Sequence, residues 1–282
     1  MSGFKEFVKL FSSSSKQEKP GKRNGTRTSQ TAEEHDQQLS ISNSGTSQAE
    51  GGFRLLANRK FATFADSTFF LPCDEEEMQR DTLSHYILKI AFGKNCMAPI
   101  EDSLGAGGNI IDGIPYRDGT FDYVILRRLC LSLKAERWPA LLDEMFRVAG
   151  KGGYVELVEI NPFCMRVGPA NTAIQEKLNE ICASRGTDPN ISTNLKVFLR
   201  EAGFVNIQHG FVSIPVGNWG DNKIGGMMGR NYREALAAVS PFMAPQLGKT
   251  PKQYDEYLDT CLAECNEFQA YSNAYWAYAQ RP

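Results

Sequence analysis

The stretch NIIDGIPYRDGTFDYVILRRL (109–129), followed by AERWPALLDEMFRVAGKGGYVELVE (135–159), decides the fold of this chain. The apolar run at 121–127 predicts a strand, and the amphipathic pattern of 135–149 predicts a helix. A Gly-Gly turn then leads into a second apolar strand at 153–160. Strand, helix and strand in this order are typical of one crossover unit in an α/β domain.

The segments around this unit continue the same alternation. Acidic residues open the segment 72–93 and an apolar stripe follows them, which predicts a helix. Because strands alternate with helices, we predict an α/β fold with a mainly parallel sheet of about four core strands. The remaining predicted helices are 98–104, 168–184, 193–202, 222–239 and 251–268, and the remaining predicted strands are 204–215 and 271–279.

The first half expected of such a domain is missing upstream. In doubly wound folds the ligand lies against a glycine-rich loop that follows the first strand. Here no strand and loop of that kind precede Asn109, and the glycine-rich segment 105–108 follows a predicted helix, so we interpret it as a flexible joint. One edge of the strand 121–127 is therefore predicted to be open, and an open edge favours pairing with another chain.

Composition limits the classes of partner and compartment. The 282 residues are 41% hydrophobic and 23% charged with a net charge of −2, so neither nucleic acid nor an acidic membrane is an expected partner. No apolar run reaches the length of a membrane span, and no signal-peptide pattern is present. Seven irregularly spaced cysteines favour a reducing, intracellular compartment, either cytoplasm or nucleus. Cys261 and Cys265, four residues apart, are predicted to be buried thiols rather than metal ligands, because a second ligand pair is lacking.

Residues 1–52 are predicted to form a disordered tail, because Ser, Gln and Gly dominate and no apolar periodicity is present. Basic residues outnumber acidic ones through Arg27. Two interpretations stay open for the tail. It is either a solvated extension or a targeting and docking segment, since Phe4, Phe7, Val8 and Phe11 would share one face of a helix.

Five motifs in this order carry a family resemblance. They are NRKFATFADSTFFLPCDEEEMQRDTLSHYILK (58–89), NIIDGIPYRDGTFDYV (109–124), WPALLDEMFRVAGKGGYVELVE (138–159), LREAGFVNIQ (199–208) and AYWAYAQRP (274–282). Together they resemble a fungal class I S-adenosylmethionine-dependent methyltransferase of the type related to secondary-metabolism regulators. The resemblance implies a Rossmann-like domain over 53–282 with a helical cap insertion at about 217–268. It also implies a deletion near 105–108 of two βα units, on the order of sixty residues.

The resemblance also assigns candidate site residues. Asn109 and Ile110 match the adenine side of the family's cofactor pocket, and Arg127 matches the methionine side. Arg80 and His85 match a motif that forms a helix over the cofactor. No metal is implied and no catalytic residue is assigned, although His209 is a candidate general base. Two interpretations stay open for Trp219, Met227, Met228 and Tyr232: they pack under the cap, or they offer apolar surface to a methyl acceptor, which is a small molecule or a protein.

Two functions from different classes remain. The first is a methyltransferase that positions S-adenosylmethionine and an acceptor but is impaired, because the glycine motif and the ribose-binding carboxylate are absent. The second is a catalytically dead methyltransferase-like module that binds a protein partner through its open strand edge. A skipped exon would also account for the gap between Leu104 and Asn109.

Overall fold

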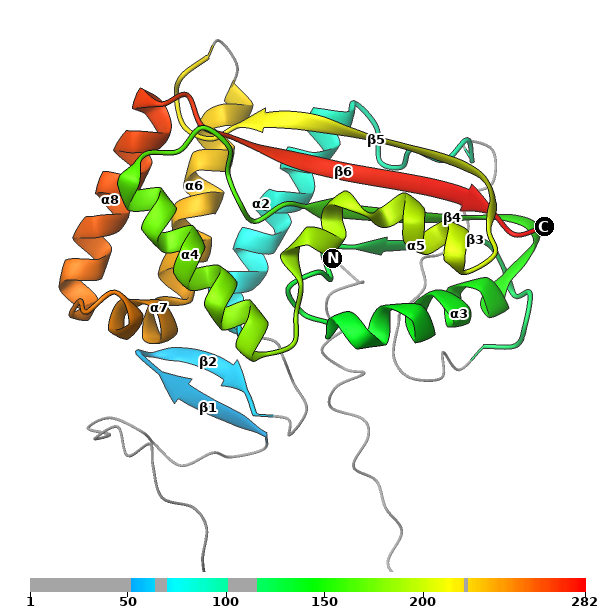
Figure 1. Ribbon diagram of the computed structural model, residues 1–282, viewed down its shortest axis with the longest axis horizontal. Coiled ribbons are helices and arrows are strands. Elements are labelled where there is room, and N and C mark those ends of the chain that lie inside the picture. Colours follow the sequence, from blue (N-terminus) through cyan, green and yellow to red (C-terminus); the bar gives the residue numbers. More distant parts are fainter. Residues whose placement is uncertain (1–51, 64–69, 101–115, 221–222) are drawn as a thin grey trace, which may run out of the picture. The chain divides into compact units, whose positions relative to one another are not determined.

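The computed structural model describes residues 52–63, 70–100, 116–220 and 223–282. The segments 1–51 and 101–115 lie outside the described residues, and so do the predicted disordered tail and the joint at 105–108. The main body is a mixed α/β structure with a four-stranded sheet and a separate two-stranded sheet (Figure 1). No helix among the described residues is long and apolar enough to cross a bilayer.

The four-stranded sheet confirms the predicted core strands. It contains β3 (Phe121–Arg127), β4 (Ala149–Ile160), β5 (Val205–Pro215) and β6 (Tyr271–Gln280), in the spatial order β3-β4-β6-β5. Strand β4 begins earlier than the predicted residue 153. Strand β3 lies at one edge of the sheet and pairs with β4 alone among the described residues, as the sequence predicts.

The prediction of a mainly parallel sheet was wrong. Only β3 and β4 pair in parallel, whereas β6 runs antiparallel to both β4 and β5. The reason lies in the helices between β5 and β6. Pro215 at the end of β5 pairs with Tyr271 at the start of β6, so the chain re-enters the sheet at the end where it left. A strand that re-enters there must run in the opposite direction.

Most predicted helices are present, and three helices rather than two fill the segment between β5 and β6. Residues 98–100 of the predicted helix 98–104 are not helical, and the rest of that segment lies outside the described residues. The helices and 3₁₀ segments are α2 (Glu75–Phe92), η1 (Ala135–Arg137), α3 (Trp138–Val148), α4 (Pro169–Ser184), η2 (Pro189–Thr193), α5 (Leu195–Glu201), α6 (Lys223–Ala238), α7 (Ser240–Gln246) and α8 (Pro251–Glu267).

A hairpin that the sequence interpretation did not include precedes the first of these helices. Strands β1 (Phe53–Leu56) and β2 (Arg59–Ala62) pair antiparallel. Ala57 and Asn58, the two residues between them, both have positive φ angles, 49° and 60°. Two such residues in succession are typical of a type I′ turn, which suits the twist of a hairpin. Phe61 is 1% exposed, and its ring meets that of Phe242 in α7 edge-on.

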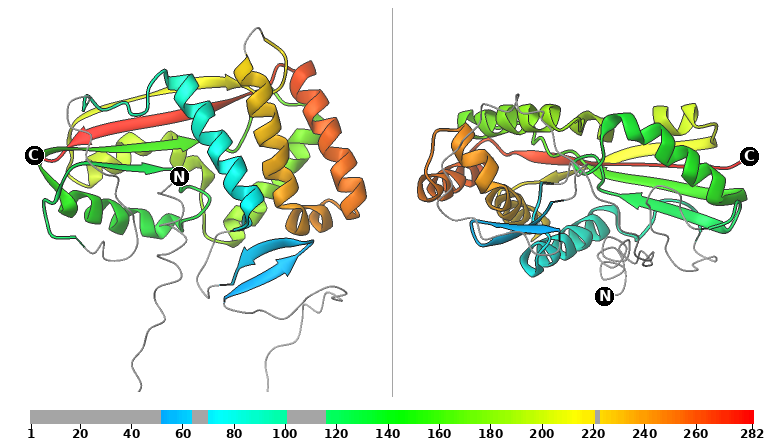
Figure 2. Two further views of the ribbon diagram at one scale, coloured as in Figure 1. Left: turned by 180° about the vertical axis from the view of Figure 1, so that it is seen from behind. Right: turned by 90° about the horizontal axis from the view of Figure 1, so that it is seen from below.

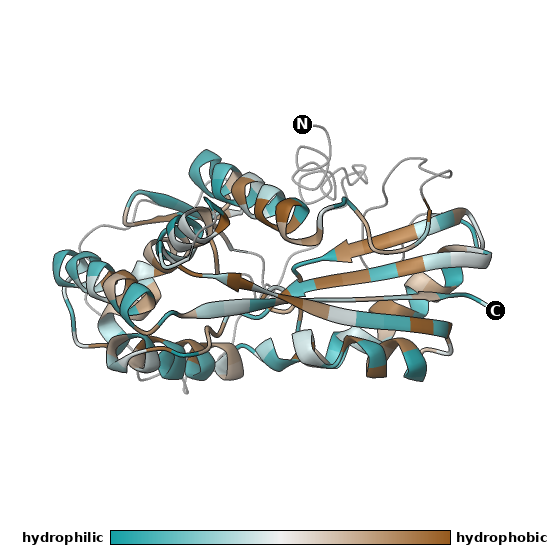
Figure 3. Ribbon diagram, turned by 90° about the horizontal axis from the view of Figure 1, so that it is seen from above, coloured by the Kyte–Doolittle hydropathy of each residue, from teal (hydrophilic) through white to brown (hydrophobic). Residues whose placement is uncertain are grey.

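Two apolar cores support the sheet. One lies between the strands and the helices α3 and α5, where Trp138, Leu142 and Met145 pack on Val155 and Leu157. The other joins α2, α4, α6, α7 and α8. Figure 2 shows α2 on the face of the sheet opposite to α3 and α5, and Figure 3 shows apolar residues along the strands and on the helix faces toward them. Helices therefore lie on both faces of the sheet, α3 and α5 on one and α2 on the other.

Candidate functional site

The candidate site lies at the carboxyl ends of β3 and β4, where α/β sheets bind ligands. β3 ends at Arg127, and Arg128 follows with a left-handed φ of 56° while its backbone N–H donates to the Val158 carbonyl at 2.9 Å. The chain therefore turns sharply away from the sheet at this point. This turn directs the two successive arginines toward the side of α2.

A buried carboxylate from β4 holds the loop that follows this turn. Glu159 is fully buried, and its two oxygens accept from the backbone N–H groups of Leu129 at 2.7 Å and Cys130 at 3.3 Å. Burial raises the pKa of Glu159 to about 7, although the two N–H donors and nearby Arg128 favour the charged form. The loop after β3 thus rests on a carboxyl group that titrates near neutral pH.

The two arginines connect β3 to the α2 segment. Arg128 forms an ion pair with Asp81 of α2, and Arg127 donates through Nη2 to the carbonyl oxygen of Asn95, just beyond α2. The Nε of Arg127 is buried and has no hydrogen-bond partner among the described residues. An unpaired buried donor is costly, so a ligand or water that accepts from this group would relieve that cost.

His85 lies near this pair of arginines. It is exposed on α2, and its ring meets that of Tyr86 edge-on. Partial burial lowers the pKa of His85, and the positive charges of Arg127 and Arg128 lower it further. The structure therefore brings two of the predicted cofactor-binding residues, His85 and Arg127, into one electrostatic environment.

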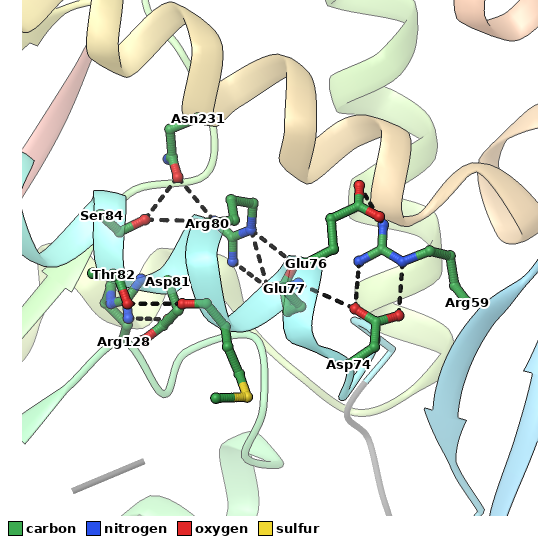
Figure 4. A network of polar contacts seen from close by, with 11 residues as sticks. Arg59, Asp74, Glu76, Glu77, Arg80, Asp81, Thr82, Ser84, Arg128 and Asn231 are labelled. Atoms are coloured by element: carbon green, nitrogen blue, oxygen red, sulfur yellow. Dashed lines mark hydrogen bonds and ion pairs between the residues drawn. The ribbon is translucent and has the colours of Figure 1, made fainter. Parts of the chain in front are cut away.

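Arg80 belongs to a different network on the same helix, shown in Figure 4. Its Nε donates to both carboxylate oxygens of Glu77, at 3.0 and 2.9 Å, and its Nη1 donates to Asn231 Oδ1 of α6 at 3.1 Å. Ser84 donates to the same Asn231 oxygen at 2.8 Å. Burial lowers the pKa of Arg80, but the bond to Glu77 outweighs it and the pKa lies above its usual value. In this structure Arg80 joins α2 to α6.

The same network continues to the start of α2. Asp74 caps the helix by accepting from the Glu77 N–H at 3.1 Å, and Arg59 of β2 donates to Asp74 from Nε and Nη2 at 2.8 Å each. Arg59 also pairs with Glu76 at 3.3 Å. The acidic start of α2, which the sequence explains by the helix dipole, therefore also connects the helix to the hairpin.

A second buried carboxylate lies on the sheet face toward α2. Glu156 is fully buried, and its Oε2 accepts from the backbone N–H groups of Met97 at 2.7 Å and Ala98 at 2.8 Å and from the Tyr123 hydroxyl at 3.1 Å. Its Oε1 has no partner among the described residues. Burial, and after it Glu156, raises the pKa of Tyr123 far above its usual value. The segment after α2 is therefore bound across this sheet face.

The sequence interpretation missed this attachment. The sequence feature that indicates this attachment is Glu156 within the otherwise apolar run at 153–160, because a buried acid requires hydrogen-bond donors. The donors Met97 and Ala98 lie about sixty residues earlier and contribute backbone groups only, so no side-chain pattern identifies them.

The other predicted residues lie elsewhere. Asn109 and Ile110 are outside the described residues. His209 is exposed on β5, at the sheet edge opposite β3. In the segment between β5 and β6, Trp219 Nε1 donates to the Ala270 carbonyl at 2.7 Å, and the buried Tyr232 hydroxyl donates to Asn171 Oδ1 at 2.9 Å.

Two methionines and two cysteines that the sequence analysis named contribute to the apolar core. Met228 is buried and Met227 packs against the same core. Cys261 and Cys265 are both buried on α8, as the sequence predicts for thiols in a core.

Comparison with known proteins gives structural neighbours of low similarity. No protein-family model and no curated protein matches the sequence. The neighbours include phosphoethanolamine N-methyltransferase 2 of Haemonchus contortus, with 16% identity over 59% of this chain and 35% of that chain and a TM-score of 0.32. A SAM-dependent methyltransferase of Archaeoglobus fulgidus is 13% identical over 59% of this chain and 62% of that chain, with a TM-score of 0.32. A putative methyltransferase of Bacillus halodurans is 15% identical over 61% of this chain and 74% of that chain, with a TM-score of 0.30.

These matches cover only part of each chain. The chain spans about a third of the length of the nematode enzyme and less than two thirds of the archaeal one. The TM-scores lie near 0.3, so these neighbours assign no function to this chain.

Proposed function

We propose that this chain is a class I S-adenosylmethionine-dependent methyltransferase whose cofactor binding is impaired, because the glycine motif of the family is absent from the sequence. The single observation that carries the proposal is the buried Nε of Arg127 at the carboxyl end of β3, which has no hydrogen-bond partner among the described residues. The family motifs assign both Arg127 and His85 to the cofactor, although they come from separate elements. Burial, and after it the positive charge of Arg127, lowers the pKa of His85. Ligands of open α/β sheets bind at this end of the strands.

Chemistry at this end of the sheet fits the methionine part of the cofactor. The guanidinium of Arg127 would pair with the methionine carboxylate, and its buried Nε, which has no partner among the described residues, would be one of the donors. Methyl transfer to an acceptor then depends chiefly on holding the sulfonium carbon in line with the attacking atom. We name no catalytic base, because His209 lies at the far edge of the sheet.

The affinity for the cofactor is expected to be low. The sequence lacks the strand with its glycine loop and the carboxylate for the ribose hydroxyls. Each hydrogen bond to a charged group contributes about 1.5 to 3 kcal/mol, so losing two of them removes about 4 kcal/mol. That loss corresponds to about a thousandfold, which converts a micromolar dissociation constant into a millimolar one.

Isothermal titration calorimetry with S-adenosylmethionine tests this proposal. We expect a millimolar dissociation constant that becomes weaker in Asn109→Ala and in Arg127→Met. Arg230→Ala is the matched control, since Arg230 is an exposed arginine on α6 that pairs with Glu234. Low-micromolar binding by the unmodified chain would contradict the predicted impairment. Equal affinity in Arg127→Met and in the control would contradict the assignment of Arg127.

A second candidate function, a methyltransferase-like interaction module, rests on a different observation. Among the described residues strand β3 pairs with β4 alone, and an unpaired strand edge favours pairing with another chain. This candidate requires a protein partner and no cofactor. Binding assays with cofactor and with protein therefore distinguish the two functions.

A further inference from the structure

Two arginines lie over one aromatic ring where the hairpin, α4 and α7 come together (Figure 1). The guanidinium carbon of Arg54 in β1 lies 6.0 Å from the centre of the Phe242 ring in α7. That of Arg185, which follows the last residue of α4, lies 5.1 Å from the same centre and 5.3 Å from the centre of the Phe70 ring. Neither guanidinium pairs with a carboxylate in the part of the chain that the structure describes.

Two other partly buried arginines show how this chain usually neutralises such a charge. Arg59 pairs with Asp74 at 2.8 Å, and Arg128 pairs with Asp81. A partner of this kind offsets the cost of removing a guanidinium from water. Arg185 is half-buried and has two ring contacts instead, which use no hydrogen bond. Its N–H groups therefore remain available for an anion.

The like charges of the two arginines over Phe242 repel each other. Burial lowers the pKa of Arg185, and the positive charge of Arg54 lowers it further. The carboxyl end of α4 favours a cation, which accounts for Arg185 but not for a second arginine on the same ring. Asp188, the acidic residue nearest to Arg185 in the sequence, caps the following 3₁₀ segment by accepting from Asn190. The pair is therefore a concentration of positive charge that an anion would neutralise.

We propose that Arg54 and Arg185 bind the phosphate group of a small phosphorylated molecule. The proposal does not depend on cofactor binding, since neither arginine belongs to the site at the carboxyl end of β3. A guanidinium offers paired N–H donors that match two oxygens of a phosphate group. A phosphate monoester carries about two negative charges at pH 7, which matches the two arginines, whereas a carboxylate carries one. The net charge of −2 on the whole chain favours a single phosphate group over a polyanion.

Thermal unfolding with glycerol 3-phosphate tests this site, and sodium chloride at equal ionic strength is the reference. We expect the unfolding temperature to rise with the concentration of the ester as for a dissociation constant of about 1 mM. Arg54→Gln and Arg185→Gln should each weaken the binding about tenfold or more, because each removes charge-assisted hydrogen bonds to the phosphate. Arg54 is exposed, so Arg54→Gln keeps the fold and the test does not rest on the half-buried Arg185 alone.

Arg200→Gln is the matched control, since Arg200 is exposed on α5 and forms no ion pair among the described residues. Inorganic phosphate should bind about as well as the ester, and acetate about tenfold more weakly or worse. No stabilisation by the ester, or equal stabilisation of the wild type, Arg54→Gln and Arg200→Gln, would overturn the proposal, because phosphate would then act on the protein as a whole or not at all. Acetate that binds as tightly as the ester would overturn the phosphate assignment. Binding of inorganic phosphate without binding of the ester would overturn the assignment to a phosphorylated molecule.

Discussion

Replacing Glu159 with glutamine should change how the stability of the protein depends on pH. Burial raises the pKa of Glu159 from 4.5 to about 7 in the folded chain. Below pH 4.5 the carboxyl group is protonated in both the folded and unfolded states. Between pH 4.5 and 7 the folded state keeps a proton that the unfolded state releases, so the free energy of unfolding falls as the pH rises. The loss is complete above pH 7.

The magnitude follows from the size of the shift. A shift of about 2.5 pKa units at about 1.36 kcal/mol each gives a loss of about 3 kcal/mol between pH 4.5 and 8. Glu159→Gln removes this titration but keeps one acceptor for the Leu129 N–H. The variant should therefore be less stable than the wild type at pH 4.5, because the Cys130 N–H loses its acceptor. Its free energy of unfolding should rise relative to that of the wild type by about 3 kcal/mol as the pH rises to 8.

Urea unfolding followed by tryptophan fluorescence at several pH values measures this difference. The other titrating groups are common to both proteins and cancel in the comparison. A difference between the two proteins that stays constant from pH 4.5 to 8 would refute the account of Glu159 as a buried group with a raised pKa. A difference that changes in the opposite direction would indicate a carboxylate stabilised in its charged form.

Three further predictions concern packing and buried polar groups. Arg80→Met should lower the free energy of unfolding in urea by about 3 to 5 kcal/mol, because it leaves Glu77 buried without its partner. Adding Glu77→Leu should restore part of that loss, and equal stability of the single and double variants would contradict this pairing. Glu264→Ala should cost about 1 to 2 kcal/mol in thermal or urea unfolding, since Glu264 accepts from two backbone N–H groups in the first turn of α4, and an unchanged stability would show that solvent replaces it. Gly210→Ala should cost about 1 to 3 kcal/mol because a Cβ there would lie 2.7 Å from the ring of Trp276, and a perturbed tryptophan fluorescence spectrum should accompany the loss.

Local patterns sufficed to predict most of the strands and helices. The apolar run around Val124 and the amphipathic pattern from Trp138 each indicate an element that is buried on a definite face, and the structure confirms both. The direction of β6 could not be predicted in this way. It depends on where three helices return the chain to the sheet, which is a property of tertiary packing rather than of the residues in 271–280.

The candidate site was predictable in part for the same reason. Family motifs point to Arg127 and His85, and their role in cofactor binding stays a prediction, although the positive charge of Arg127 lowers the pKa of His85 in the structure. The partner of Arg80 at Asn231 lies 151 residues away, and no local pattern connects the two. Buried acids inside an apolar strand, Glu156 and Glu159, were visible in the sequence as exceptions. Their donors are backbone groups, which carry no sequence signal.

The most direct test of the proposed methyltransferase function restores the missing half of the cofactor-binding domain. A family-like segment of two βα units, with its glycine loop and ribose-binding carboxylate, would be inserted between Gly105 and Asn109. Calorimetry would then compare S-adenosylmethionine binding in the restored and original chains. We predict a change from a millimolar to a micromolar dissociation constant, together with better solubility because the β3 edge is covered. A restored, folded chain that bound the cofactor no better than the original would contradict the assignment of this fold to methyl transfer.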